Sequence, residues 1–201
     1  LHLREDRRHI IDKDVEEIKV ALKTKMNLEM AATDEMIKIA SKISPQDCCL
    51  VPEKREELTT EGGLDVASQL PRMKEVCAQL DDSKIRVSLF IDADKKQIDA
   101  AMVCGAPVIE IHTGHYADAL KPAERELKYN EIIKSCKYAH SLGLQVNAGH
   151  GLTLENTFAI AKIDSIIELN IGHSIISRAV FVGLENATTE METLMLEARG
   201  L

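Results

Sequence analysis

The sequence predicts an α/β protein whose strands run parallel in one sheet. Five short strand-like runs are separated by stretches of helix length that carry apolar residues at helical spacing. Parallel strands need such crossover connections, whereas antiparallel strands can be joined by tight turns. The five runs are residues 25–30, 86–92, 108–114, 145–151 and 165–172.

A second observation is that every other position of these strands is polar. Strands of a parallel sheet covered on both faces normally read as unbroken apolar runs. Here one parity is apolar and the other carries carboxylates, amides and imidazoles, and the two parities point to opposite faces. If the sheet closes into a barrel, the polar groups converge inside it. The polar positions include Asn27, Glu29, Ser88, Asp92, Glu110, His112, Glu168 and Asn170.

The N-terminal elements follow from local signals. Residues 1–4 have the pattern of the last part of a strand, and residues 12–22 place apolar side chains at helical spacing after acidic residues. The strand at 25–30 comes next. Thr33 then suits the N-cap of a helix, and an extended run at 48–52 follows the proline that ends this helix.

The middle of the chain continues the alternation after a long polar segment, residues 53–65. Loops of this length in compact domains are usually functional or mobile. A helix is expected through residues 70–80, where Pro71 is a point of kinking or restart. The strand at 86–92 and a helix over 95–104 follow.

The C-terminal third repeats the same unit. A long helix begins at Pro122 and is followed by the strand at 145–151. A helix is expected after Thr153, before the strand at 165–172. The region from Ser174 onward has the apolar spacing of a final helix.

These elements amount to seven strands in β/α alternation, one short of an eightfold barrel. We therefore predict a (β/α)8 TIM barrel in which residues 1–201 form a single domain and the first strand and helix are absent from this chain. Such barrels have ~250 residues, so one further unit of ~40 residues before Leu1 accounts for the difference. An open doubly wound sheet is the alternative. The barrel is favoured because polar residues recur on nearly every strand instead of gathering at one switch point.

The composition restricts the classes of partner and compartment. The formal net charge is −8 and aromatic residues make up 3% of the chain, which disfavours nucleic acid because its binding uses basic surfaces and stacking rings. The five cysteines show no CxxC spacing, so we expect a reduced cytoplasmic protein. No apolar run approaches the ~20 residues of a membrane span.

Two strand carboxylates are candidates for proton transfer. Glu29 and Glu110 lie near the carboxyl ends of their strands, where barrels place their active sites. A desolvated carboxylate close to a second one suits a general base, and a buried glutamate paired with Arg4 is the structural alternative. His112 and His115 raise the question of a metal site. Because no carboxylate-rich ligand set accompanies them, no metal is expected.

Two strand ends combine glycine with histidine. The turn at 147–151 places His150 between glycines that permit close approach of the backbone to a ligand, although a tight turn with a solvated histidine has the same pattern. The segment 170–174 ends one strand and opens the last helix, where exposed amides favour phosphate. An ordinary helix cap at Ser174 is the alternative.

Charged runs at 4–9 and 53–57 are typical of solvated loop surface. Arg4 and His9 in the first run are nevertheless the best placed cations for a second anionic group, since arginine binds phosphate in a bidentate manner. Because the chain as a whole is acidic, an anionic ligand needs such a local cationic spot.

Long motifs follow one another in a fixed order along the chain. They are residues 2–10 (HLREDRRHI), 27–30 (NLEM), 51–55 (VPEKR), 59–65 (TTEGGLD), 110–114 (EIHTG), 147–151 (NAGHG) and 168–173 (ELNIGH). Together they resemble the pyridoxine 5'-phosphate synthase family, the ring-closing enzymes of a vitamin B6 pathway. The resemblance runs through essentially the whole chain, and ordered motifs of this length are far more specific than one glycine pattern.

The resemblance implies a bacterial cytoplasmic barrel enzyme that forms a homo-octamer and needs no cofactor. It would condense 3-amino-2-oxopropyl phosphate with 1-deoxy-D-xylulose 5-phosphate to form pyridoxine 5'-phosphate, phosphate and water. The implied proton acceptors are His2 and Glu29, the proton donor is His150, and Glu110 is the carboxylate that stabilises the transition state. The implied binding residues are Arg4, His9 and Thr59 for the deoxyxylulose phosphate and Gly151, Gly172 and His173 for the amino ketone phosphate. The family's first strand, with its Asn-x-Asp-His motif, has no counterpart in this sequence.

Two other function classes stay open at the level of the sequence. Another barrel enzyme acting on a phosphorylated sugar, such as an isomerase or aldolase, would normally use a Schiff-base lysine or a metal, and the strand interiors offer neither convincingly. A truncated binding or assembly subunit would keep the packing surfaces without the chemistry. The leading hypothesis is an enzyme in which the amine of one substrate forms a Schiff base with the ketone of the other.

Overall fold

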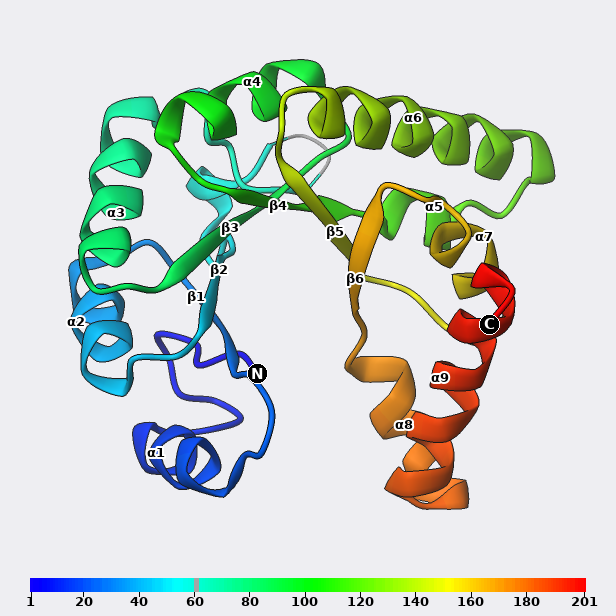
Figure 1. Ribbon diagram of the computed structural model, residues 1–201, viewed down its shortest axis with the longest axis horizontal. Helices are drawn as coiled ribbons and strands as arrows, with labels where there is room; N and C mark the ends of the chain where they lie inside the picture. The colour runs from blue at the N-terminus through cyan, green and yellow to red at the C-terminus, as the bar shows by residue number, and fades with distance from the viewer. Residues whose placement is uncertain (60–61) are drawn as a thin grey trace. The chain divides into compact units, whose positions relative to one another are not determined.

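The computed structural model describes residues 1–59 and 62–201, so Thr60 and Glu61 of the 59–65 motif lie outside the described residues. Within the described chain, six strands alternate with helices (Figure 1). The pairs β1–β2, β2–β3 and β5–β6 are parallel, which confirms the α/β class. The strands are β1 (Asn27–Met30), β2 (Asp47–Leu50), β3 (Arg86–Ile91), β4 (Val108–His112), β5 (Gln145–Gly149) and β6 (Ile166–Asn170).

The order of the strands decides against the doubly wound alternative. A doubly wound sheet reverses its direction of growth at a switch point, so its strand order departs from chain order. The described strands follow one another from β1 to β6 in chain order. Sequential winding of this kind is the arrangement found in β/α barrels.

The chain forms two compact units, Leu1–Glu110 and Ile111–Leu201. The first contains α1 (Asp12–Ala21), α2 (Asp34–Ile43), the 3-10 turn η1 (Arg55–Glu57), α3 (Leu70–Asp82) and α4 (Lys95–Cys104). The second contains α5 (Gly114–Asp118), α6 (Pro122–Ser141), α7 (Thr157–Ala161), α8 (His173–Val182) and α9 (Leu184–Arg199).

The first unit buries the apolar parity of its strands. Leu28 and Met30 of β1 are fully buried, whereas Asn27 and Glu29 between them are partly exposed. In Figure 1, α2, α3 and α4 run along the outer side of β1–β3, where they cover the apolar face. The predicted cap of α2 is confirmed, since the hydroxyl of Thr33 accepts a free N–H of the first helical turn at 3.4 Å.

The predicted strand at residues 1–4 is wrong in extent. His2 forms only an isolated parallel bridge to Glu29, flanked by a hydrogen bond from the N–H of Leu3 to the Glu29 carbonyl at 3.2 Å. The pairing stops there because the chain turns away from the sheet: the N–H of Arg7 donates to the carbonyl of Arg4 at 3.0 Å. The seven predicted strands therefore become six strands and the bridge at His2 in the described chain.

The helix expected through residues 70–80 is α3, and Pro71 lies in its first turn, where it marks the start of the helix and not a kink. The start of the last helical region differs from the sequence expectation. Gly172, not Ser174, is the N-cap of α8. Ser174 already lies inside the first turn, and its hydroxyl donates instead to the carbonyl of Leu152 at 2.6 Å.

The final helical region is two helices and not one. Gly183, with a φ of 83°, separates α8 from α9, and such a backbone conformation favours glycine. Side by side, α8 and α9 form a helical hairpin in the second unit (Figure 1). None of the helices in the described ranges is both long and apolar enough to cross a membrane.

Replacement of Leu28 by alanine should lower the free energy of unfolding by about 2–5 kcal/mol, because it leaves a cavity in the core behind β1. Urea unfolding followed by circular dichroism measures this change. Val20→Ala on α1, whose side chain is 89% exposed, is the matched control and should change the free energy by less than about 0.5 kcal/mol. Equal effects of the two substitutions would contradict the predicted core.

Candidate active site

The parallel register of the first unit aligns one row of polar side chains. Glu29 on β1 is paired with Cys49 on β2, which is paired with Ser88 on β3. Residues in register point to the same face of a sheet. The Cys49 thiol donates to Oε2 of Glu110 on β4 at 3.4 Å, so this carboxylate lies on the same face. Glu29 and Glu110 therefore share a face with one thiol between them.

This row is electrostatically unusual because it buries a thiol beside carboxylates. Cys49 is fully buried and Glu110 is 3% exposed, whereas the side chain of Glu29 is 30% exposed. Burial, and then the negative charges of Glu110 and Glu29, raise the pKa of the Cys49 thiol well above its ordinary value. Cys49 is thus a protonated hydrogen-bond donor and not a nucleophile, and Glu29 is the carboxylate that a ligand can reach.

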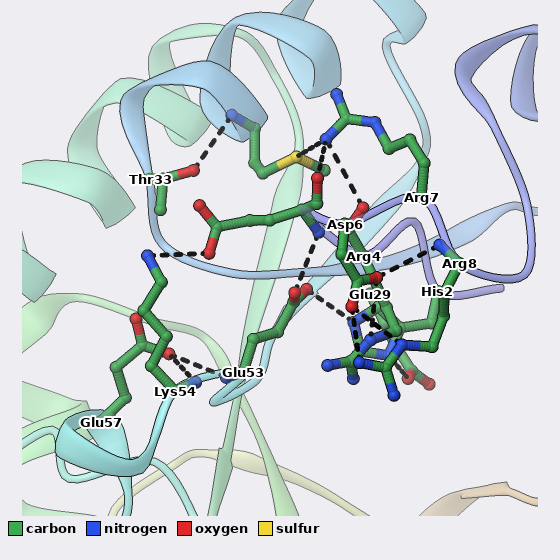
Figure 2. A network of polar contacts seen from close by, with 12 residues as sticks. His2, Arg4, Asp6, Arg7, Arg8, Glu29, Thr33, Glu53, Lys54 and Glu57 are labelled. Carbon is green, nitrogen blue, oxygen red and sulfur yellow. Dashed lines mark hydrogen bonds and ion pairs between the residues drawn. The ribbon is translucent and has the colours of Figure 1, made fainter.

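The ring of His2 contacts two carboxylates. Its Nε2 atom lies 2.9 Å from Oε1 of Glu53, and its Nδ1 atom lies 3.6 Å from Oε2 of Glu29, as the dashed lines in Figure 2 mark. The first distance is that of a hydrogen bond and the second is longer than one. The backbone bridge between His2 and Glu29 keeps the imidazole beside this carboxylate.

Glu53 lies in the 51–55 motif of the family resemblance, but sequence reasoning assigned it no role, because the charged run 53–57 reads as solvated loop. Its side chain is only 4% exposed, and its Oε2 atom accepts the N–H of Glu5 at 2.9 Å. The turn that buries it is closed by Glu57, whose carboxylate accepts the N–H groups of Glu53 and Lys54 at 2.8 and 3.1 Å. The available signal was position: Glu53 follows the carboxyl end of β2, where barrels place functional groups.

Arg7 fixes the segment 4–9. Its guanidinium lies 3.0 Å from the carboxylate of Asp12 on α1 and 2.5 Å from that of Glu35 on α2. It also donates to the carbonyl of Glu5 at 2.9 Å. The hydrogen bond to Asp12 is the main reason that the pKa of Arg7 is raised, so the side chain keeps its charge and ties the segment to both helices.

The two predicted cations of this segment differ in their exposure. His9 is exposed, and the Arg4 side chain is 27% exposed beside Asp6, with which it forms an ion pair at 3.5 Å. The Nε atom of Arg4 is buried and makes no hydrogen bond, so the guanidinium keeps donor capacity for an anionic ligand.

Thr59 is held at the end of β3 by Asp92. The Thr59 hydroxyl donates to one oxygen of this 6% exposed carboxylate, and the N–H of Gly63 donates to the other at 3.1 Å. The N–H of Gly62 donates in turn to the Thr59 hydroxyl at 3.1 Å. A Cβ atom on Gly63 would lie 2.6 Å from the backbone nitrogen of Asp92, so the close approach requires glycine.

In the second unit, the backbone of His150 is held in a rarely adopted conformation. Its φ is 82°, in the left-handed region that residues with a Cβ seldom occupy. The fully buried Thr113 stabilises it, with its hydroxyl 2.6 Å from the His150 carbonyl and its N–H donating to the Gly149 carbonyl at 2.8 Å. Residues held in such rarely adopted conformations cluster at functional sites. At this turn the backbone of His150 departs from the extended conformation of β5.

Three imidazoles gather around this turn, and two glycines allow close packing there. The ring centroids of His112 and His150 are 4.9 Å apart, and those of His112 and His115 are 5.7 Å apart. A Cβ atom on Gly114 would lie 2.6 Å from Nε2 of His112, and one on Gly151 would lie 2.7 Å from a side chain of α5. Across the described ranges, no group of three or more His, Cys, Asp or Glu has the geometry to hold a metal ion.

Gly172 and His173 lie at a different place in the second unit, the start of α8. Both are exposed, and a Cβ atom on Gly172 would meet nothing within 4 Å. On the two preceding strands, the amide of Asn147 donates to Glu168 at 3.2 Å between paired positions of β5 and β6. The polar parity of the sequence is thus present on these strands as well.

Comparisons with known proteins identify the family. The family model described as pyridoxal phosphate biosynthesis protein PdxJ matches residues 1–197. The chain belongs to the PdxJ family. It is 58% identical over 199 residues to the pyridoxine 5'-phosphate synthase of Photobacterium profundum, and the alignment covers 99% of this chain and 82% of that protein.

Solved structures support the fold of this PdxJ chain. It is similar to KGPDC from Streptococcus mutans with a TM-score of 0.61, and to a ligand complex of the same protein with a TM-score of 0.64. Each similarity covers 92% of this chain and 78% of the other at 13% sequence identity. At this identity the likeness concerns the fold alone.

We expect the five cysteines of this PdxJ protein to resist thiol reagents in the folded state. Burial raises the pKa of Cys77 and Cys136 to about 12 and that of Cys48 and Cys49 further. Because a raised pKa leaves the thiol protonated, little thiolate exists at about pH 8. Labelling with a disulfide reagent, followed by mass spectrometry, should be slow for the native protein and complete in denaturant. Rapid labelling of native Cys49 would show that solvent reaches the thiol beside Glu110.

Proposed function

We propose that this protein is a pyridoxine 5'-phosphate synthase that condenses 3-amino-2-oxopropyl phosphate with 1-deoxy-D-xylulose 5-phosphate. The observation that carries the proposal is the match along almost the whole chain to a synthase of this name. The polar face of the first unit supports it, since it carries the imidazole of His2 beside Glu29 and the carboxylate of Glu110 bonded to the Cys49 thiol.

The chemistry begins when the amine nitrogen of one substrate attacks the ketone carbon of the other. Water leaves and a Schiff base forms, after which proton transfers carry the adduct through elimination, addition and ring closure. His2 and Glu29 accept protons, His150 donates one, and Glu110 stabilises the charge that develops. The partial exposure of Glu29, with Glu110 buried behind Cys49, is consistent with this division of roles.

Two anion sites complete the assignment. Arg4, His9 and Thr59 bind the deoxyxylulose phosphate, and the cations of segment 4–9 supply local positive charge in a chain that is acidic as a whole. Gly151, Gly172 and His173 bind the amino ketone phosphate. The exposed N-terminus of α8 favours this placement, because its unpaired amides and the helix dipole attract phosphate.

The remaining features of the proposal follow from the family resemblance. The chain belongs to a single (β/α)8 barrel domain of a cytoplasmic homo-octamer, and its partners are small phosphorylated substrates instead of nucleic acid or membrane. No cofactor or metal takes part. Sequential strand order and the polar parity of β1, β3, β4 and β6 support the barrel.

Glu29→Gln should lower turnover by ~10²-fold or more while substrate binding stays largely intact, because the amide keeps the shape but cannot accept the proton. Steady-state kinetics and calorimetric binding measure the two effects. Glu17→Gln on α1, with a side chain that is 65% exposed, is the charge-matched control. Near-normal turnover of Glu29→Gln would remove the base from the proposed mechanism.

Gly172→Val should weaken binding of the amino ketone phosphate roughly 10-fold or more, about 1.4 kcal/mol, by blocking the approach of phosphate to the α8 amides. The protein itself has room for the new side chain, so the unfolding temperature should not change. Calorimetry on both substrates makes the test, with binding of the deoxyxylulose phosphate as the internal control. Equal affinity before and after the substitution would place the phosphate elsewhere.

A further inference from the structure

We propose that Glu53 is a positioning residue that holds the proton of neutral His2 on Nε2, so that Nδ1 is the atom that accepts a proton in the reaction. The inference rests on the proposed function, in which His2 is a proton acceptor. It goes further by naming the accepting atom and the residue that selects it.

The hydrogen bond between His2 and Glu53 determines which ring nitrogen carries the proton. An ionised carboxylate can only accept hydrogen bonds, so the nitrogen at 2.9 Å from Oε1 of Glu53 must be protonated. In a neutral imidazole, a proton on Nε2 leaves the lone pair on Nδ1. Glu53 therefore selects one of the two tautomers of His2.

The carboxylate of Glu53 is itself held in one orientation. The second carboxylate oxygen accepts the N–H of Glu5 at 2.9 Å, and the backbone N–H of Glu53 donates to the Glu57 carboxylate at 2.8 Å. Its side chain is 4% exposed, so water competes little for these bonds. An orienting group that is both buried and hydrogen-bonded keeps an imidazole in place more firmly than a solvated one.

The opposite edge of the ring faces the side that a ligand can reach. Nδ1 lies 3.6 Å from Oε2 of Glu29, which is longer than a hydrogen bond, so Glu29 does not require a proton on Nδ1. The side chains of His2 and Glu29 are 27% and 30% exposed, in contrast to that of Glu53. Figure 2 marks these two contacts of the ring and draws Glu53 within its own bonding network.

The proton transfer balances at these atoms. A proton leaves the bound substrate for the lone pair of Nδ1, and the electron pair of the broken bond stays with the substrate. The ring becomes an imidazolium that keeps its Nε2 proton, and the carboxylates of Glu53 and Glu29 stabilise its positive charge. Release of the Nδ1 proton to a later intermediate restores the neutral ring. The same division of labour between base and orienting carboxylate operates in the Ser-His-Asp triad.

The first test observes the tautomer of His2 without substrate. Nitrogen-15 NMR of the histidine-labelled protein distinguishes Nε2–H from Nδ1–H, and loss of one signal set in His2→Gln assigns the residue. We expect neutral His2 to carry its proton on Nε2. In Glu53→Gln, the amide oxygen keeps the Glu5 N–H and the amide nitrogen faces the ring, so the proton should move to Nδ1. A wild-type ring protonated on Nδ1, or an unchanged tautomer in Glu53→Gln, would overturn the proposal.

The second test measures catalysis by the same variant. Glu53→Gln should lower kcat by about 10-fold or more and leave both KM values within about twofold, because only proton transfer is affected. Glu56→Gln removes the same charge from the same turn at an exposed position and should change neither kcat nor the tautomer. A thermal melt of Glu53→Gln close to that of the wild type shows that the fold is kept. Unchanged kcat in Glu53→Gln would also overturn the proposal.

The two tests separate this inference from the proposed function. The tautomer is read in the substrate-free protein, so its result stands even if no pyridoxine 5'-phosphate is formed. Absence of synthase activity in the wild type would refute the proposed function alone. Full activity together with an unchanged Glu53→Gln variant would refute the role of Glu53 alone.

Discussion

The parallel register of β1, β2 and β3 is the constraint on which the rest of the first unit depends. It places Glu29, Cys49 and Ser88 in one row, and a slip of one residue would turn that row toward the covering helices. Carboxylates buried against apolar helices without partners are strongly destabilising. The polar row therefore specifies the register at the same time as it forms the candidate site.

Much of the fold follows from periodicity in the sequence. Alternating polarity locates the strands and helical spacing locates the helices, and Thr33 marks a helix start because its side chain acts within a single turn. The strand at residues 1–4 is overpredicted because its pattern is as short as the bridge that forms. Ser174 is misplaced as a cap for a related reason, since the difference between a cap and the first helical turn is only two residues.

The site is less accessible to sequence reasoning, because its decisive contacts are tertiary. Nothing in the run 53–57 distinguishes the buried Glu53 from its exposed neighbour Glu56 until Glu5 and His2 are brought to it. The support of His150 is hidden in the same way, since it comes from the buried hydroxyl of Thr113. The two histidines are held by different means, one by a side-chain carboxylate and the other by a constrained backbone turn.

The contacts of Arg7 connect exposed residues of the outer helices to the candidate site. Its guanidinium joins the segment bearing Arg4 and His9 to Glu35, whose side chain is 63% exposed on α2. Surface positions usually drift freely during evolution, because substitutions there change stability little. Here an exchange at Glu35 alters the restraint on the segment that carries two of the proposed phosphate-binding residues. Under the proposed function, natural variation on α2 would therefore adjust substrate affinity from a position that looks functionally silent.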